Sequence, residues 1–131
     1  MIVIIDYETG NLHSVRRGLE KAGGTVSVTA DPAVVAAADA IVLPGVGAFA
    51  RGMANLDRTG LVPLIRERVS AGVPFLGICL GMQLLFDESD EDGRHKGLGL
   101  LPGRVVRFGT GLKVPQRGWN QVAQTRPDPL W

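Results

Sequence analysis

A single cysteine framed by two glycines is the segment most suited to chemistry. Gly77-Ile78-Cys79-Leu80-Gly81 follows an apolar run and precedes a helical pattern, which predicts a strand turning sharply into a helix at Cys79. Glycines two positions to either side let the strand and the helix approach without Cβ clashes. The amide of Leu80 and the helix start would direct positive potential at the sulfur and at an oxyanion beside it. That arrangement suits acyl transfer from an amide.

The alternative for Cys79 is a structural role. A lone cysteine is more often a small buried hydrophobic residue than a nucleophile, and Gly-x-Cys-x-Gly also occurs by chance. The chain has one cysteine and two histidines, His13 and His95. It therefore has neither an internal disulfide nor a Cys/His set with zinc-site spacing. Cys79 is therefore expected to be a free thiol, with no metal and no cofactor.

A glycine-rich loop is the second chemical signal. The segment Leu43-Pro44-Gly45-Val46-Gly47-Ala48-Phe49 directly follows a predicted strand. In a parallel sheet such loops emerge at the carboxyl edge, where ligands bind, so this loop and the cysteine turn are expected to share one rim. Gly45 and Gly47 could turn backbone amides toward an oxyanion, whereas the alternative is an ordinary tight turn. The loop matches neither the phosphate-loop motif nor the dinucleotide-binding motif.

The elements that must position these segments alternate along the chain. Apolar runs predict strands over residues 2–5, 25–29, 40–43 and 74–78, and helical patterns cover residues 12–22 and 61–71. Asn11 can cap the first helix, Gly23 and Gly24 can end it, and Asp31-Pro32 marks another helix start. Continuous apolar strands separated by helices indicate an α/β fold, with a parallel sheet covered on both faces.

The pattern changes after residue 98. Short β-prone pieces, Val105-Val106 and Lys113-Val114 among them, are interrupted by glycines. They predict irregular antiparallel strands appended to the parallel sheet. A length of 131 residues without a flexible linker predicts a single domain over residues 1–131.

Composition excludes several classes of function. The 14 basic and 13 acidic residues leave a formal net charge of +1, which gives no field suited to nucleic acid or an anionic membrane. The basic residues near the end of the chain lack interleaved aromatics, which argues against nucleic-acid binding; they are Arg104, Arg107, Lys113 and Arg117. No apolar run is long enough to span a membrane and no signal peptide opens the chain, so we expect a cytoplasmic protein.

Two further groups of titratable residues are interpreted as surface features. The run from Asp87 to Asp92 holds five carboxylates in six residues, but it lacks EF-hand spacing and predicts a solvated loop without a function. His13 is expected in the first helix turn and His95 in a polar loop. Either ring could be invoked as a base for the thiol, which needs one within hydrogen-bond reach, but surface positions are the default for both.

The chain resembles, from end to end, the glutaminase subunit of imidazole glycerol phosphate synthase, a class I glutamine amidotransferase. The matching segments, in order, cover residues 6–11, 44–49, 77–86, 98–103, 113–115 and 118–120. The cysteine turn alone would fit any class I glutamine amidotransferase. The opening Asp6-Tyr7-Glu8-Thr9-Gly10-Asn11 and the segment Gly118-Trp119-Asn120 are particular to this subunit.

This resemblance implies a flavodoxin-like sheet and a Cys-His-Glu triad that hydrolyses L-glutamine through a thioester. The ammonia would pass to a cyclase subunit, a (β/α)₈ barrel, in a heterodimer that makes imidazole glycerol phosphate and aminoimidazole carboxamide ribotide in histidine biosynthesis. Carried onto this sequence, Cys79 is the nucleophile, and Leu80 with Val46 or Gly47, in the loop that begins at Gly45, supplies oxyanion amides. Gln83 would help to hold the glutamine. The residues expected near the cyclase are Asn11, Trp119 and Asn120.

The sequence departs from the family at several points. Glu8 stands where a glycine is common, and Gln116-Arg117 replaces the usual His-Met before Gly118. The histidine and glutamate of the triad belong to strands beyond residue 131, so the domain is expected to be C-terminally incomplete and the chain as given to be inactive. A non-catalytic interaction module of the same fold is the alternative function. Another protein with a cysteine at such a turn is a third, which the Gly118-Trp119-Asn120 segment opposes.

Overall fold

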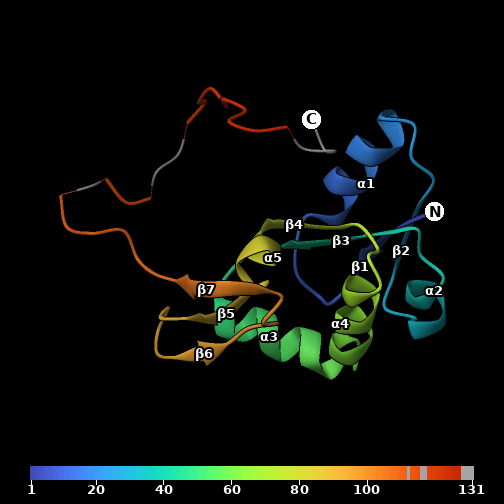
Figure 1. Ribbon diagram of the computed structural model, residues 1–131, viewed down its shortest axis with the longest axis horizontal. Helices are drawn as coiled ribbons and strands as arrows, with labels where there is room; N and C mark the ends of the chain where they lie inside the picture. Colours follow the sequence, from blue (N-terminus) through green and yellow to red (C-terminus); the bar gives the residue numbers. More distant parts are fainter. Residues whose placement is uncertain (112, 116–117, 128–131) are drawn as a thin grey trace.

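Four apolar strands form the parallel sheet that the sequence predicts. A computed structural model describes residues 1–111, 113–115 and 118–127. The strands are β1 (Ile2–Ile5), β2 (Val26–Thr29), β3 (Ala40–Gly45) and β4 (Phe75–Cys79). Their order is β2-β1-β3-β4, and every neighbouring pair is parallel (Figure 1). The predicted α/β class is confirmed.

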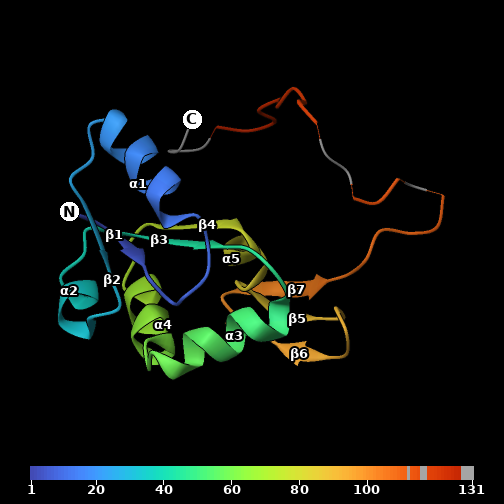
Figure 2. The same ribbon diagram turned by 180° about the vertical axis from the view of Figure 1, so that it is seen from behind.

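The helices begin and end largely where the sequence signals stand. They are α1 (Leu12–Lys21), α2 (Pro32–Ala36), α3 (Phe49–Arg58), α4 (Val62–Ser70) and α5 (Leu80–Gln83). The Asn11 side chain accepts a hydrogen bond from the Ser14 amide at 3.2 Å, and Asp31 caps α2 in the same way at 2.9 Å. Gly23 ends α1 with a φ of 92°. Figure 2 shows α1 on one side of the sheet, with α3 and α4 on the other.

Most of the core lies between the sheet and helices α2 to α4. In α4 the apolar stripe faces inward as predicted, with Leu61 and Ile65 fully buried and Leu64 and Val69 packed against the same cluster. Helix α3 is absent from our prediction. Its Phe49, Met53 and Leu56 follow helical spacing, but Gly52 and Asn55 lie among its buried positions, and its N-cap residue, Ala48, has no side chain that could cap the helix. Those residues obscured the apolar stripe.

A second, three-stranded sheet follows the cysteine turn. It contains β5 (Phe86–Ser89), β6 (His95–Lys96) and β7 (Leu101–Val105) in the order β6-β5-β7. β5 pairs antiparallel with β6 and parallel with β7, and both β5 and β6 precede residue 98, where our prediction of appended strands began. The small sheet is therefore mixed and separate from the main sheet, not an antiparallel extension of it.

The residues after β7 differ from the prediction. Lys113 and Val114 form no strand, and the segment leaves the sheets as an extended trace, orange to red in Figure 1. The departure at Gln116-Arg117 lies outside the described residues. Among the helices of the described residues, none has the length and apolar character needed to cross a membrane.

Candidate active site

Cys79 occupies a strained backbone position at the junction of β4 and α5. It has φ 56° and ψ −117°, in the left-handed half of conformational space that a residue with a Cβ rarely adopts. Its side chain is exposed. The structural alternative, a small buried hydrophobic residue, is therefore wrong for this position, while the predicted strand-to-helix turn is confirmed.

The two glycines around Cys79 are required by close backbone packing. A Cβ on Gly81 would collide with the carbonyl oxygen of Leu43 on β3, and a Cβ on Gly77 would lie 2.6 Å from Cα of Met82 on α5. Both approaches are closer than a carbon side chain tolerates. The sequence argument for glycine at these two positions is confirmed.

The glycine-rich loop begins beside the cysteine. Gly45 pairs with Cys79 in the sheet register, so the ends of β3 and β4 share one rim as predicted. A Cβ on Gly45 would collide with the hydroxyl of Tyr7 and lie 3.0 Å from the Gly81 amide nitrogen. Gly45 is therefore needed for the packing of three segments.

Tyr7 packs beneath the ends of β3 and β4 and bonds to the glycine-rich loop at Pro44. Our sequence interpretation gave it no role. Its ring is 1% exposed, and its hydroxyl donates a hydrogen bond of 2.5 Å to the carbonyl of Pro44. Burial raises the pKa of Tyr7 far above its usual range, and the charge of Cys79 raises it further. The phenol consequently stays protonated and keeps donating to Pro44.

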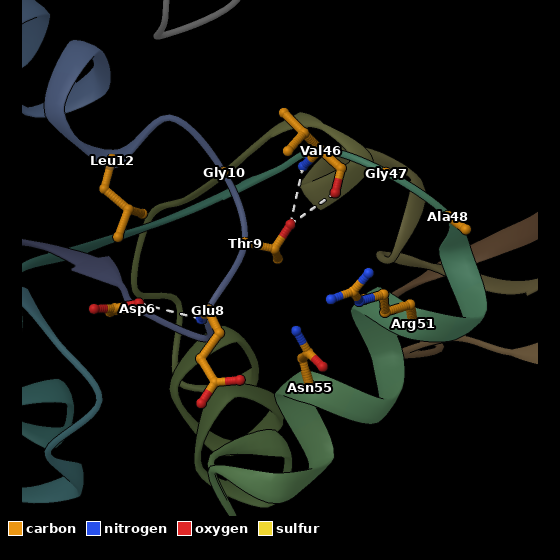
Figure 3. Close-up of a pocket in the computed structure, with 11 residues that line it drawn as sticks. Asp6, Glu8, Thr9, Gly10, Leu12, Val46, Gly47, Ala48, Arg51 and Asn55 are labelled. Atoms are coloured by element: carbon orange, nitrogen blue, oxygen red, sulfur yellow. Dashed lines mark hydrogen bonds between the residues drawn. The ribbon is translucent and has the colours of Figure 1, made fainter.

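Thr9 holds the exposed part of the loop. Its hydroxyl donates to the Val46 carbonyl at 2.7 Å, while the Val46 amide points back at the same oxygen, 3.3 Å away (Figure 3). The Val46 amide, one of the two expected oxyanion donors, is thus engaged with Thr9 in this conformation. Gly47, the other, is exposed with a φ of 97°.

Comparison with known proteins places this geometry in a family. The family model described as glutamine amidotransferase class I matches residues 3–130. The chain belongs to the class I glutamine amidotransferases. It is 57% identical over its whole length to imidazole glycerol phosphate synthase subunit HisH of Syntrophotalea carbinolica, of which it covers 67%. It is 56% identical over 99% of its length to the HisH subunit of Moorella thermoacetica and covers 62% of that protein.

A cyanobacterial relative gives the same result. The chain is 53% identical over 99% of its length to the HisH subunit of Synechococcus elongatus and covers 61% of it. The chain thus spans roughly three-fifths to two-thirds of the length of these curated relatives. The resemblance stated from the motifs is confirmed.

The amidotransferase residues expected to bind substrate or partner occupy different parts of the chain. Leu80 starts α5 directly after Cys79, and Gln83 ends that helix, one turn further on and partly exposed. Asn11 is exposed at the start of α1. Trp119 and Asn120 are exposed in the extended segment after β7. The structure therefore brings Leu80 and the loop at Gly45 to Cys79, whereas the described residues 118–127 around Trp119 are all exposed.

The acidic segment, residues 87–92, is not the featureless solvated loop that we predicted. Asp87 and Glu88 belong to β5, and the Asp87 carboxylate accepts a hydrogen bond from the Gly103 amide at 2.9 Å. The Glu91 carboxylate accepts one from the Phe49 amide at 2.6 Å, which caps α3. Asp87 thus joins β5 to β7, and Glu91 joins the segment after β5 to the helix that follows the glycine-rich loop. Within the described residues, no group of three His, Cys, Asp or Glu could hold a metal.

Neither histidine is hydrogen-bonded to the cysteine in the part of the chain that the structure describes. His13 is exposed in the first turn of α1, as predicted. His95 lies in β6 instead of a loop, and its Nε2 is 3.3 Å from the carbonyl oxygen of Asp92. The described residues thus present a nucleophile and backbone amides without a histidine bonded to the thiol.

The packing of Gly81 gives a first prediction. Gly81→Ala is expected to lower the free energy of unfolding by about 3 kcal/mol, because the new methyl group must displace the backbone of β3. Denaturant unfolding measures the change. Gly18→Ala is the matched control, since no atom lies within 4 Å of a Cβ at this helical position. It should instead stabilise α1 by about 0.5 to 1 kcal/mol. Similar effects of the two variants would contradict the packing argument.

Proposed function

We propose that this chain provides the nucleophile of a glutaminase that serves imidazole glycerol phosphate synthesis in the cytoplasm. The observation that carries the proposal is that Cys79 is exposed, with a φ of 56°, at the junction of β4 and α5. The chain is also more than half identical to HisH subunits. An exposed free thiol is also suited to a reducing compartment. The substrate is L-glutamine.

The proposed reaction begins at the Cys79 sulfur. The thiolate attacks the side-chain amide carbon of glutamine, and the negative charge moves to the carbonyl oxygen. Collapse of this tetrahedral intermediate breaks the C–N bond, and the protonated nitrogen leaves as ammonia. Water then cleaves the thioester to glutamate and restores the thiol.

Backbone amides stabilise the oxyanion in this proposal. Leu80 supplies one of them, because it directly follows the nucleophile at the start of α5. The second comes from the glycine-rich loop. We propose that Gly47 or Val46 supplies it, and that Val46 can do so only when its hydrogen bond to Thr9 opens. Gln83 is placed one helical turn beyond the sulfur to hold the rest of the substrate.

The chemistry also needs a group that protonates the departing nitrogen and activates water. In our proposal residues 1–131 belong to one amidotransferase domain, and the family's histidine and glutamate lie in the part of the relatives that these residues do not span. Those two residues complete the triad in a longer chain. The proposed partner is a cyclase subunit with a (β/α)₈ barrel, which receives the ammonia in a heterodimer.

A non-catalytic interaction module is a second candidate function. It is favoured by one observation: no histidine or carboxylate of the described residues is hydrogen-bonded to Cys79. Release of labelled ammonia from glutamine, measured with and without the cyclase, separates the two. A module would bind the cyclase without any turnover.

We further propose that Trp119 and Asn120, together with Asn11, contact the cyclase. Trp119 is fully exposed, with a relative accessibility of 104%, so the described residues provide no packing for this large ring. Aromatic residues of this kind commonly dominate the energy of an interface.

Trp119→Ala is therefore expected to weaken cyclase binding by about 30-fold, the effect typical of a hot spot of about 2 kcal/mol. The thermal unfolding midpoint should not change, because no described contact is removed. Val122→Ala is the control, since Val122 is 79% exposed in the same segment. Titration calorimetry and thermal melts measure both quantities. Unchanged affinity together with a large loss of stability would show that Trp119 has a packing role.

A further inference from the structure

The carbonyl of Pro44 lies where the main sheet stops and the glycine-rich loop begins. The pairing of β1 with β3 ends at Ile4 and Val42, two residues before Pro44. Proline has no N–H, so the carbonyl is the only backbone group through which Pro44 can form a hydrogen bond. Among the described residues, the hydroxyl of Tyr7 donates to it at 2.5 Å. A side chain thus takes over the role of the strand ladder at this point.

This hydrogen bond restrains the peptide from which the loop departs. The peptide bond is planar, so a fixed carbonyl at Pro44 also fixes the direction of the Gly45 amide. The loop contains a second glycine, Gly47, with a φ of 97°, so its backbone provides little restraint of its own. Thr9 holds Val46, but that bond must open if the Val46 amide is to face an oxyanion. The bond to Pro44 involves neither expected oxyanion donor and can remain in place in both arrangements.

Gly45 brings the phenol, the loop and the cysteine turn into one contact. A Cβ at Gly45 would collide with the Tyr7 hydroxyl, and it would lie 3.0 Å from both the Gly81 amide nitrogen and the Leu80 Cβ. Gly45 also pairs with Cys79 in the sheet register. The hydroxyl therefore meets the loop at the residue that abuts the start of α5. A loop that moved away from Tyr7 would change its distance from the Leu80 amide, the other expected oxyanion donor.

Packing alone does not require the hydroxyl of Tyr7. The ring is 1% exposed and belongs to the hydrophobic core, where phenylalanine would fill the same space without burying a polar group. Burial, and to a smaller extent the charge of Cys79, raises the pKa of Tyr7, so the phenol stays protonated through the neutral range. Tyr7 is thus a permanent hydrogen-bond donor that is too buried to contact a bound substrate.

We propose that Tyr7 is a positioning residue of the glutaminase. Its hydrogen bond to Pro44 holds the glycine-rich loop at the distance from Leu80 at which one amide from each segment binds the same oxyanion. The proposal rests on the proposed function, and it adds a residue outside the nucleophile, the oxyanion amides and the acid-base group. Tyr7 affects the reaction only through the position of the loop.

Tyr7→Phe tests this role in a chain of the length of the curated relatives, mixed with the cyclase. The variant loses the hydroxyl and keeps the ring. We expect kcat for glutamine hydrolysis to fall about 10- to 100-fold, the loss typical of a misplaced catalytic group. KM should change less than about twofold, because the oxyanion forms only as the reaction proceeds. The ratio of the two kcat values should stay constant from about pH 6 to 9, since the phenol does not titrate there.

Ile65→Val is the matched control. Ile65 is a fully buried core residue of α4, and the loss of one methyl group should lower the thermal unfolding midpoint by about 2 to 4 °C. Tyr7→Phe should lower the midpoint by a similar amount, because the Pro44 carbonyl loses its donor. The control should keep the kcat of the unsubstituted enzyme. Equal losses of kcat in the two variants would show that stability alone explains them, and the proposal would fail.

Three other results would overturn the role of Tyr7. They are an unchanged kcat in Tyr7→Phe, a higher KM at unchanged kcat, and a kcat ratio that varies with pH, which would make the phenol an acid or a base. Cys79→Ala separates these results from a failure of the proposed function. If Cys79→Ala is inactive and Tyr7→Phe matches the unsubstituted enzyme, only the role of Tyr7 is refuted. If Cys79→Ala still hydrolyses glutamine, the proposed function fails and the role of Tyr7 fails with it.

Discussion

Replacing Cys79 with alanine, in a chain of the length of the curated relatives, is expected to reduce glutamine hydrolysis by on the order of 10⁶-fold, the loss typical of removing a nucleophile. The reason is that no thioester can form without the sulfur, and the backbone amides around Leu80 then have no tetrahedral intermediate to stabilise. The cyclase should still work when ammonium salt replaces glutamine, because only the nitrogen source is lost. Release of labelled ammonia and formation of imidazole glycerol phosphate are measured in parallel.

A second substitution at the same position separates catalysis from folding. Cys79 has a φ of 56°, where a Cβ costs about 1 to 2 kcal/mol and glycine does not. Cys79→Gly is therefore expected to raise the free energy of unfolding by about 1 kcal/mol while hydrolysis is still lost. A stabilised but inactive variant would be the signature of a strained residue kept for its chemistry. Glutamine turnover by either variant would remove Cys79 from the mechanism.

The main sheet could be predicted from the sequence because its signals are local. Each strand is an apolar run, and the caps Asn11 and Asp31 act within three residues of their own positions. The cysteine turn was equally accessible. Gly77 and Gly81 each lie two residues from Cys79. A Cβ at either position would collide with a neighbouring element, α5 for Gly77 and β3 for Gly81.

The parts that escaped prediction depend on contacts between distant residues. Tyr7 bonds to Pro44 and Thr9 to Val46, each across 37 positions, and Glu91 caps α3 across 42. The sequence shows an acidic run at residues 87–92. It does not show that the carboxylate of Glu91 accepts a hydrogen bond at the start of α3. The small sheet was misjudged for a similar reason, since the parallel pairing of β5 with β7 skips β6.

Helix α3 shows how a polar residue can obscure a helical pattern. Asn55 and Gly52 interrupted the apolar stripe of α3, so the helix was not predicted. In the structure, Gly52 leaves room for Leu80, whose Cδ2 would lie 2.9 Å from an added Cβ. Asn55 points into the pocket beside the glycine-rich loop (Figure 3). The residues that weakened the helical signal are thus those that adapt α3 to its neighbours.

The 131-residue chain itself, mixed with a cyclase subunit, is expected to hydrolyse glutamine about 10² to 10⁴-fold more slowly than a relative of full length, the usual loss without an acid-base group. Cys79 can still attack, but nothing in the described residues is bonded to it that could protonate the departing nitrogen. His95 faces the Asp92 carbonyl, and His13 is exposed on α1. Steady-state ammonia release at saturating glutamine measures the difference.

His13→Ala and His95→Ala serve as controls for this prediction, because each removes one of the two histidines in the sequence. Neither should change the residual rate. Turnover comparable with that of a full-length relative would contradict the chemical argument, and its loss in one histidine variant would then identify an unexpected base.

Light scattering on the same samples tests a second expectation, that the isolated chain self-associates. Among the described residues, β4 pairs only with β3, and Leu76 and Met82 are 40% and 49% exposed. The isolated chain should therefore self-associate.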